Sequence, residues 1–161
     1  MRLGDSQDYE LVKEKLYDES SEYRGFIWVL TKEGKATFLA KMKKKQGEKR
    51  DATLIELASI RLQATSKDVA VTVKLLRPLS DHDGIYAFEL RPNPRKSVIR
   101  VMAYLHHDDT RQAVLLFPFE GHKKKSAGID PKYLEKAKRL AGIARSLCEQ
   151  KQRLKFIDTT M

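Results

Sequence analysis

Three consecutive strand-like segments between residues 84 and 119 constrain the fold of this chain more than any other feature. Residues 84–91 and 98–106 alternate apolar and polar side chains with the two-residue period of a half-buried β-strand. The residues between them, 92–97, include two prolines and an asparagine, which favour a turn. The two segments therefore predict a β-hairpin with one apolar face, which belongs to the core, and one polar face.

The polar face of this hairpin is the first candidate site. Alternation places Glu89 and Arg91 on it from the first strand, and Arg100 and Tyr104 from the second. Because the two polar faces coincide, we expect Glu89, Arg91 and Arg100 to be neighbours. The structural alternative is a cross-strand ion pair between Glu89 and Arg100, which would stabilise the hairpin by only about 0.2–1 kcal/mol.

A third segment, residues 112–119, is apolar in both registers and predicts a central strand that is covered on both faces. It leads into one histidine and three lysines at residues 122–125. Pro131 then opens a helix whose apolar residues recur every three or four positions, so we expect this helix to lie against the sheet. Cys148, the single cysteine, falls in that apolar stripe and is expected to be a buried hydrophobic residue rather than a nucleophile.

The N-terminal half predicts two helices between strands. Residues 26–30 predict a strand, and residues 36–45 and 51–63 predict helices. The alternating valines of residues 68–76 predict an added edge strand.

The first 25 residues form an acidic leader, with seven acidic and four basic residues and a net charge of −3, so the remainder carries +13. Residues 7–22 are consistent with a short amphipathic helix, because Tyr9, Val12 and Leu16 share one stripe. The leader either screens the basic body of the protein or docks elsewhere through this stripe.

Several segments, taken in order, resemble a known family. They are Phe-Glu-Leu-Arg at residues 88–91, Arg-Val-Met-Ala-Tyr at residues 100–104, the apolar strand followed by lysines, and the helix that contains Pro131, Glu135 and Ala137. From roughly residue 26 to residue 144 the chain is similar to the RelE/HigB toxins of type II toxin-antitoxin systems, especially their phage-derived branch. The resemblance implies an α+β fold, in which two helices from the N-terminal half and a C-terminal helix pack on a small, twisted, mainly antiparallel sheet. Residues 1–25 would be an acidic, helical extension and residues 26–161 the toxin domain.

The resemblance also implies an activity, the ribosome-dependent cleavage of mRNA by an endoribonuclease. Such a reaction needs a base for the 2′-hydroxyl, cations for the phosphorane and an acid for the 5′-oxygen. The candidate catalytic residues are Arg91 and Arg100 for the charge, His122 for proton transfer and Glu89 as a base. The candidate substrate-binding residues are Lys123, Lys124, Lys125, Arg77, Arg95 and Tyr104.

The chain departs from the lysine-based site of several family members, because it carries Ala87 and Glu89 where they carry lysines. The loop lysines are alternatively solvated or in contact with ribosomal RNA, and Tyr104 is alternatively a buried strand tyrosine. His106 and His107 precede acidic turn residues, and adjacent histidines do not readily face one metal ion. We therefore expect no metal and no other cofactor.

The implied partners are a separate antitoxin, expected to be a helix-turn-helix protein, together with the ribosome and mRNA. The net charge of +10 and the isoelectric point near 9.7 favour polyanionic partners. Two other functions fit the same fold: a ParE-like inhibitor of gyrase, and a non-catalytic phage-derived nucleic-acid-binding protein. A basic cluster at one helix end is either a solvated surface or a grip on ribosomal RNA; its members are Lys41, Lys43, Lys44 and Lys45.

Membrane association is not expected from the sequence. No apolar run approaches the roughly 20 residues that span a bilayer, and the first 25 residues lack the apolar centre of a secretory signal. We therefore expect a cytoplasmic protein.

Overall fold

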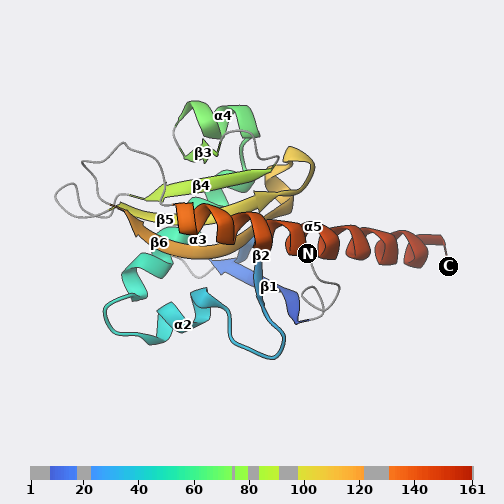
Figure 1. Cartoon of the computed structure of the whole chain (residues 1–161), viewed down its shortest axis with the longest axis horizontal. Helices are drawn as coiled ribbons and strands as arrows, with labels where there is room; N and C mark the ends of the chain where they lie inside the picture. The colour runs from blue at the N-terminus through green and yellow to red at the C-terminus, as the bar shows by residue number, and fades with distance from the viewer. Residues whose placement is uncertain are drawn as a thin grey trace.

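A six-stranded sheet forms the centre of the part of the chain described by this computed structural model, which is residues 8–17, 23–73, 75–79, 84–90, 98–121 and 131–160. The strand order is β1-β2-β6-β5-β4-β3 (Figure 1). All neighbouring strands are antiparallel except β2 and β6, which are parallel. The strands are β1 (Tyr9–Tyr17), β2 (Tyr23–Lys32), β3 (Leu76–Pro78), β4 (Ile85–Leu90), β5 (Val98–Leu105) and β6 (Ala113–Gly121).

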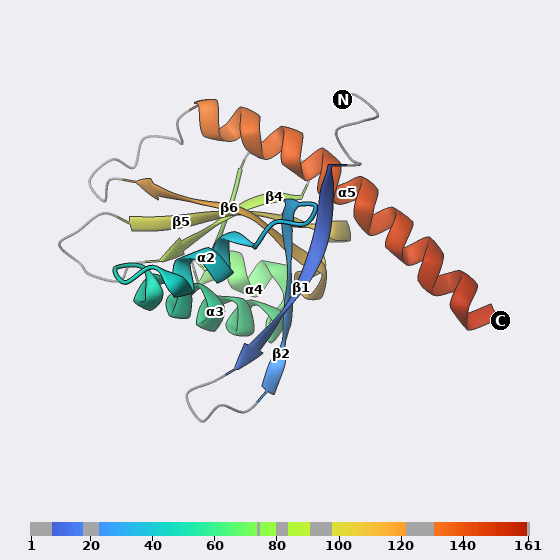
Figure 2. The ribbon, with the colours of Figure 1, turned by 90° about the horizontal axis from the view of Figure 1, so that it is seen from below.

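Helices cover both faces of the sheet, so the described chain has three layers (Figure 2). The helices α2, α3 and α4 lie on one face, and α5 crosses the other and extends past the sheet at its C-terminal end (Figures 1 and 2). The mixed α+β fold with a mostly antiparallel sheet is therefore confirmed at this coarse level. The helices are α2 (Phe38–Lys44), α3 (Lys49–Gln63), α4 (Lys67–Thr72) and α5 (Pro131–Thr160).

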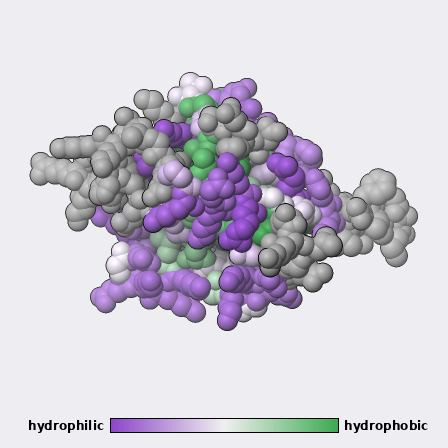
Figure 3. Space-filling model, viewed as in Figure 1, coloured by the Kyte–Doolittle hydropathy of each residue, from purple (hydrophilic) through white to green (hydrophobic). Residues whose placement is uncertain are grey.

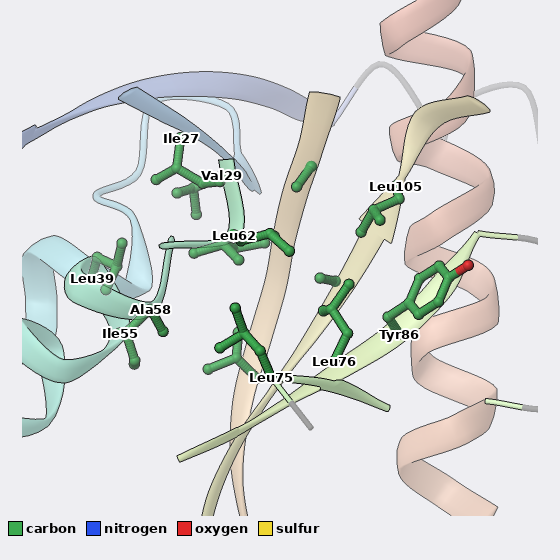
Figure 4. Packing of buried hydrophobic residues seen from close by; sticks show 14 of the residues in the cluster. Ile27, Val29, Leu39, Ile55, Ala58, Leu62, Leu75, Leu76, Tyr86 and Leu105 are labelled. Carbon is green, nitrogen blue, oxygen red and sulfur yellow. The ribbon is translucent and has the colours of Figure 1, made fainter. Parts of the chain in front are cut away.

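The first core fills the space between the sheet and α2, α3 and α4 (Figure 4). Ile27 and Val29 of β2, Leu39 of α2, and Ile55 and Leu62 of α3 are all at most 1% exposed. Burying side chains of this size contributes about 1.5–3 kcal/mol each to stability. The predicted helices at residues 36–45 and 51–63 are confirmed in this layer.

The second core lies between the sheet and α5, and a bulge shapes it. Met102 of β5 pairs with Phe117, but Ala103 pairs with Leu115, so Leu116 is skipped in the ladder. The extra residue shifts the alternation by one position, so the residues of β6 after the bulge face the opposite side of the sheet from the one that the residues before it would predict. Phe117 therefore packs towards α5, although strict alternation along the strand would place it on the same face as Leu115. Phe119, Val114 and Leu116 share this second core.

Residues 9–17 form an edge strand, so the helix predicted over residues 7–22 is wrong where the structure describes it. β1 pairs with β2 along its length, with Leu11 opposite Leu30 and Lys13 opposite Trp28. The sequence of this segment alternates as well as it follows a helical stripe, and pairing with a neighbouring strand selects the extended form. The leader thus adds a strand to the sheet, while the division of the chain at residue 25 stays a prediction.

The strand predicted over residues 68–76 is wrong for most of its length. Ser66 caps a short helix, α4, by accepting a hydrogen bond from the Val69 amide at 3.3 Å, and Asp68 lies in the first turn. Ala70 is buried against the first core, while Val69 and Val73 are exposed. The edge strand of this region is β3, which begins only at Leu76 and pairs with β4.

Candidate functional site

Arg100 lies near the end of the sheet where β4 ends, β5 begins and β6 ends. In the register of the sheet, Arg100 is paired with Glu89 of β4 on one side and with Phe119 of β6 on the other. Val98 is likewise paired with Gly121, the last residue of β6. The predicted hairpin and the juxtaposition of Glu89 with Arg100 are therefore confirmed at the level of strand register.

The alternation of the hairpin predicts that the face with Arg100 is an open polar surface. In the structure this face is covered. It also carries Ala87 and Met102, which are fully buried, and α5 packs on it. Arg100 itself is only 8% exposed, so its guanidinium is held largely inside the protein. The sequence signal for this burial was present in the apolar residues interspersed with the polar ones on the same face.

An aromatic cluster with lysines lies beside Arg100, where α5 begins. The rings of Phe119 and Tyr133 are 5.0 Å apart between centroids, and Phe117 is 6.4 Å from Tyr133. The Lys136 ammonium lies 4.4 Å from the centre of the Phe117 ring, and that of Lys132 lies 5.1 Å from the centre of the Tyr133 ring. Such contacts of ammonium groups over ring faces are attractive and orient the lysines along the surface.

The outward surface of α5 is mostly hydrophilic where the space-filling view shows it (Figure 3). Between Pro131 and residue 150 the helix carries five basic and two acidic residues. A surface of this kind attracts polyanions through charge, independently of any catalytic site. The basic residues are Lys132, Lys136, Lys138, Arg139 and Arg145.

Tyr104 lies further along β5, hydrogen-bonded to the buried His106 and to Arg145, an exposed residue of α5. The Tyr104 hydroxyl is 2.8 Å from His106 Nδ1 and accepts a hydrogen bond from Arg145 Nε at 3.3 Å. Burial raises the pKa of Tyr104 above its ordinary value, and the hydrogen bond and charge of Arg145 partly offset this rise. Because Tyr104 is 3% exposed, its ring does not stack on a base in this arrangement, which favours the structural alternative for this residue.

A groove lies on the face of the sheet opposite to α5, near the end of β6. It runs between β6 and the hairpin formed by α2 and α3. Its volume is about 340 Å³. Of its residues, only the lysines stand out in the sequence, as part of the basic cluster; the rest come together through the packing of α2 on β6. The groove is lined by Phe38, Lys41, Met42, Lys45, Glu48, Asp51, Pro118 and Phe119.

The remaining candidate residues are separated from Arg100 or lie outside the described residues. Arg77 is half-buried on the edge strand β3, opposite Ala87, so β4 lies between it and β5. The candidates outside the described residues are Arg91, Arg95, His122, Lys123, Lys124 and Lys125.

The histidines after β5 occupy a tight turn. His107 and Asp108 both have a φ of 56°, in the left-handed region that non-glycine residues seldom adopt. The Asp108 carboxylate accepts a hydrogen bond from the Tyr86 hydroxyl at 3.0 Å and lies 3.7 Å from the Lys67 ammonium, which holds the turn in place. Among the described residues, no group of three or more His, Cys, Asp or Glu side chains is placed to share a metal ion.

Cys148 is buried in the second core, which confirms its predicted place in the apolar stripe of α5. Within the described residues, no helix is both long enough and apolar enough to cross a membrane.

Comparison with known proteins identifies no relative: no family model, no curated protein and no solved structure matches the chain.

Proposed function

We propose that the chain is a toxin of the RelE/HigB type, a ribosome-dependent endoribonuclease that cuts mRNA and is held inactive by an antitoxin. The observation that carries this proposal is the position of Arg100. It pairs with Glu89 near the end of the sheet, two residues along β5 from the pairing of Val98 with Gly121. The segment with His122 and the three lysines continues the chain directly from Gly121.

The order of elements supports the same proposal. One strand, two helices, a hairpin, a central strand and a C-terminal helix follow one another as the resemblance implies. The strands β1 and β3 and the short helix α4 are additions to that plan. Fold alone does not establish an activity, so the proposal depends on the residues at the β6 end.

In the proposed reaction, Arg100 supplies positive charge to the scissile phosphate as the phosphorane forms. A guanidinium held by a packed environment needs no reorganisation at that moment, and it acts more strongly away from bulk water. His122 carries protons between the 2′-hydroxyl and the 5′-oxygen, because an imidazole titrates near neutral pH. Glu89 is the alternative base, and the ribosome orients the mRNA.

The test is induced expression in growing bacterial cells, with mapping of new mRNA 5′ ends. The wild-type chain is expected to arrest translation and to produce new 5′ ends only in translated messages. Arg100→Ala should lower cleavage by the equivalent of a few kcal/mol of transition-state stabilisation. Arg111→Ala, which removes an exposed arginine of the turn before β6, is the matched control and should cleave like the wild type.

Because Arg100 is buried, each variant also needs a measurement of its thermal unfolding. Arg100→Lys keeps a positive charge and should retain more activity than Arg100→Ala at comparable stability. Wild-type cleavage by a folded Arg100→Ala protein would show that the site is misplaced. Growth arrest with intact mRNA and inhibited gyrase would instead indicate the ParE-like function.

A second candidate is a non-catalytic nucleic-acid-binding protein on the same fold. The burial of Arg100 at 8% exposure and the coverage of both sheet faces favour it, because they limit the access of a phosphate to that side chain. This function predicts salt-dependent RNA binding through the basic surface of α5 without new mRNA ends. Charge reversal at Lys132 and Lys136 would then weaken binding, whereas Arg100→Lys would not.

A further inference from the structure

We propose that the groove between α2 and β6 binds one guanine nucleotide, with the base on its apolar floor and the phosphate at the lysines. The biological ligand, a guanine in RNA, rests on the proposed function. The binding of a free nucleotide does not, and it can be measured without ribosomes.

The floor of the groove suits a planar ring. Phe38, Met42 and Pro118 supply this floor, with Met42 buried and the other two half-buried. The ring of Phe119 lies on the other face of the sheet, against Tyr133. Aromatic side chains and proline offer flat apolar surfaces on which nucleobases stack. A volume of about 340 Å³ lies at the lower end of the range for small-molecule sites, so the groove admits a single nucleotide rather than a helical segment of RNA.

One side of the groove is prepared for an anion. Lys41 and Lys45 are four residues apart, at the end of α2, and both line the groove. Like charges at this spacing repel each other on a helix surface, and a phosphate between them would turn that repulsion into attraction. Within the described part of the chain neither lysine forms an ion pair, whereas Lys43 on the same helix is 2.9 Å from Glu56.

The other side carries two carboxylates, Glu48 and Asp51, from the start of α3. An ionised carboxylate only accepts hydrogen bonds, and its two oxygens match two adjacent donors. Among the RNA bases, guanine alone presents two adjacent donors, N1–H and the 2-amino group, on its pairing edge. In adenine, cytosine and uracil, each donor on that edge is flanked only by acceptors. The second oxygen of a carboxylate would face such an acceptor, and the two would repel each other.

The groove adjoins the candidate catalytic region through β6. Pro118 and Phe119 line the groove, and in the sheet they are paired with Val101 and Arg100. A nucleotide bound in the groove would therefore lie near the end of β6, on the face of the sheet opposite to α5 and to the side chain of Arg100. The groove would select the base of an RNA whose chain continues around the end of β6 towards the cleavage site of the proposed function.

Methionine methyl groups allow a direct test. The chain has four methionines, of which Met42 lines the groove and Met102 is buried in the second core, on the other face of the sheet. In protein labelled with ¹³C-methyl methionine, GMP should shift the Met42 signal, assigned with Met42→Leu, and leave that of Met102 in place. AMP, CMP and UMP should bind at least about fivefold more weakly, as expected for loss of one bidentate contact to the base.

Variants separate the two sides of the groove. Lys41→Gln and Lys45→Gln should weaken GMP binding and its salt dependence but leave guanosine binding unchanged. Lys44→Gln removes the same charge from the same helix outside the groove and serves as the control. Asp51→Asn and Glu48→Gln should reduce the preference for GMP over AMP, and an unchanged Met102 signal reports that each variant is folded.

Four outcomes would overturn the inference: no shift of Met42 with GMP, equal binding of all four nucleotides, an equal shift with inorganic phosphate, or equal effects of Lys44→Gln and Lys45→Gln. Failure of mRNA cleavage in cells would leave a positive GMP titration intact. A negative titration would likewise leave the proposed cleavage intact, so the two proposals fail independently.

Discussion

The Tyr104 hydroxyl is linked to α5 by a hydrogen bond from Arg145 and to the turn after β5 by one with the buried His106. Arg145 only donates, so the hydroxyl accepts from Arg145 Nε, and His106 Nδ1 lies 2.8 Å from the same oxygen. His106 is 1% exposed, and water is therefore a poor replacement for the phenol. The hydroxyl thus holds a buried imidazole and a helix side chain in one arrangement.

Tyr104→Phe should lower the free energy of unfolding by about 1–2 kcal/mol at neutral pH, since it leaves a buried polar group without this partner. Burial raises the pKa of Tyr104, so the folded state favours the neutral phenol. This stabilisation is present below the ordinary phenol pKa of about 10 and is lost as the pH rises further. The advantage of the wild type over Tyr104→Phe should therefore shrink above about pH 10.

Urea unfolding at neutral and alkaline pH measures both effects. Tyr133→Phe is the control, because the Tyr133 hydroxyl has no hydrogen bond within the described residues. A constant difference between wild type and Tyr104→Phe across the alkaline range would contradict the assigned rise in pKa.

Alanine substitution at two glycines distinguishes the energetic cost of a left-handed backbone from the cost of a steric clash. Gly84 and Gly34 have nearly equal φ values, 79° and 76°. A Cβ added to Gly84 would lie 2.9 Å from both the Leu105 carbonyl oxygen and Tyr104 Cε1, but one added to Gly34 meets nothing within 4 Å. Gly34→Ala should cost about 1–2 kcal/mol of stability from the left-handed backbone alone, and Gly84→Ala clearly more. If thermal unfolding shows that Gly34→Ala and Gly84→Ala lose the same amount of stability, the predicted clash at Gly84 is refuted.

The N-cap residues of α2 and α4 differ in their further hydrogen bonds, because only the cap of α2 also bonds to a side chain of β1. Thr37 is buried; its hydroxyl accepts from the Ala40 amide at 3.1 Å and donates to the Glu14 carboxylate of β1. Ser66 is an exposed cap of α4. Ser66→Ala should cost about 0.5–2 kcal/mol, the usual loss of a cap, and Thr37→Ala more, since it also releases Glu14. Thr37→Ser should restore most of the loss, and chemical denaturation of the three variants is the measurement.

At the scale of elements, the sequence predicts what depends on local periodicity and misses what depends on pairing. The hairpin, the central strand, α2, α3 and α5 follow patterns that agree with their tertiary contacts. Residues 9–17 carry both a helical stripe and an alternation, and the partner strand β2 decides between them. In α4 the alternating valines favour a strand, but the cap at Ser66 and the acidic first turn favour a helix, which prevails.

The candidate site was predictable only in part. The pairing of Glu89 with Arg100 follows from the hairpin register, which sequence alternation specifies. The burial of Arg100 depends on which face α5 covers, and the position of Phe117 depends on the bulge at Leu116; neither is a local property. The groove joins residues of α2 and α3 to residues of β6 that lie far away in the chain, so sequence patterns alone do not indicate it.

At the scale of the whole molecule, residues 9–17 of the acidic leader form an edge strand of the sheet. Glu10 accepts a hydrogen bond from the Gly34 amide at 3.2 Å, and Glu14 accepts one from Thr37, so both carboxylates anchor β1 to the segment before α2. Lys13 lies 4.0 Å from the centre of the Phe26 ring of β2. These contacts favour structural docking of the leader over electrostatic masking of the basic body.

Deleting residues 1–22 should therefore destabilise the protein by several kcal/mol and promote self-association, because β2 would become an unpaired edge. Thermal unfolding and light scattering at several protein concentrations measure both effects.

The charge of the leader is tested separately with the double variant Glu10→Gln/Glu14→Gln, which keeps hydrogen-bond acceptors on β1. Glu33→Gln/Asp68→Asn, which removes two exposed charges elsewhere, is its control. If the leader is structural, both double variants should strengthen binding of single-stranded RNA equally at low salt; a clearly larger gain for the first would restore the screening hypothesis.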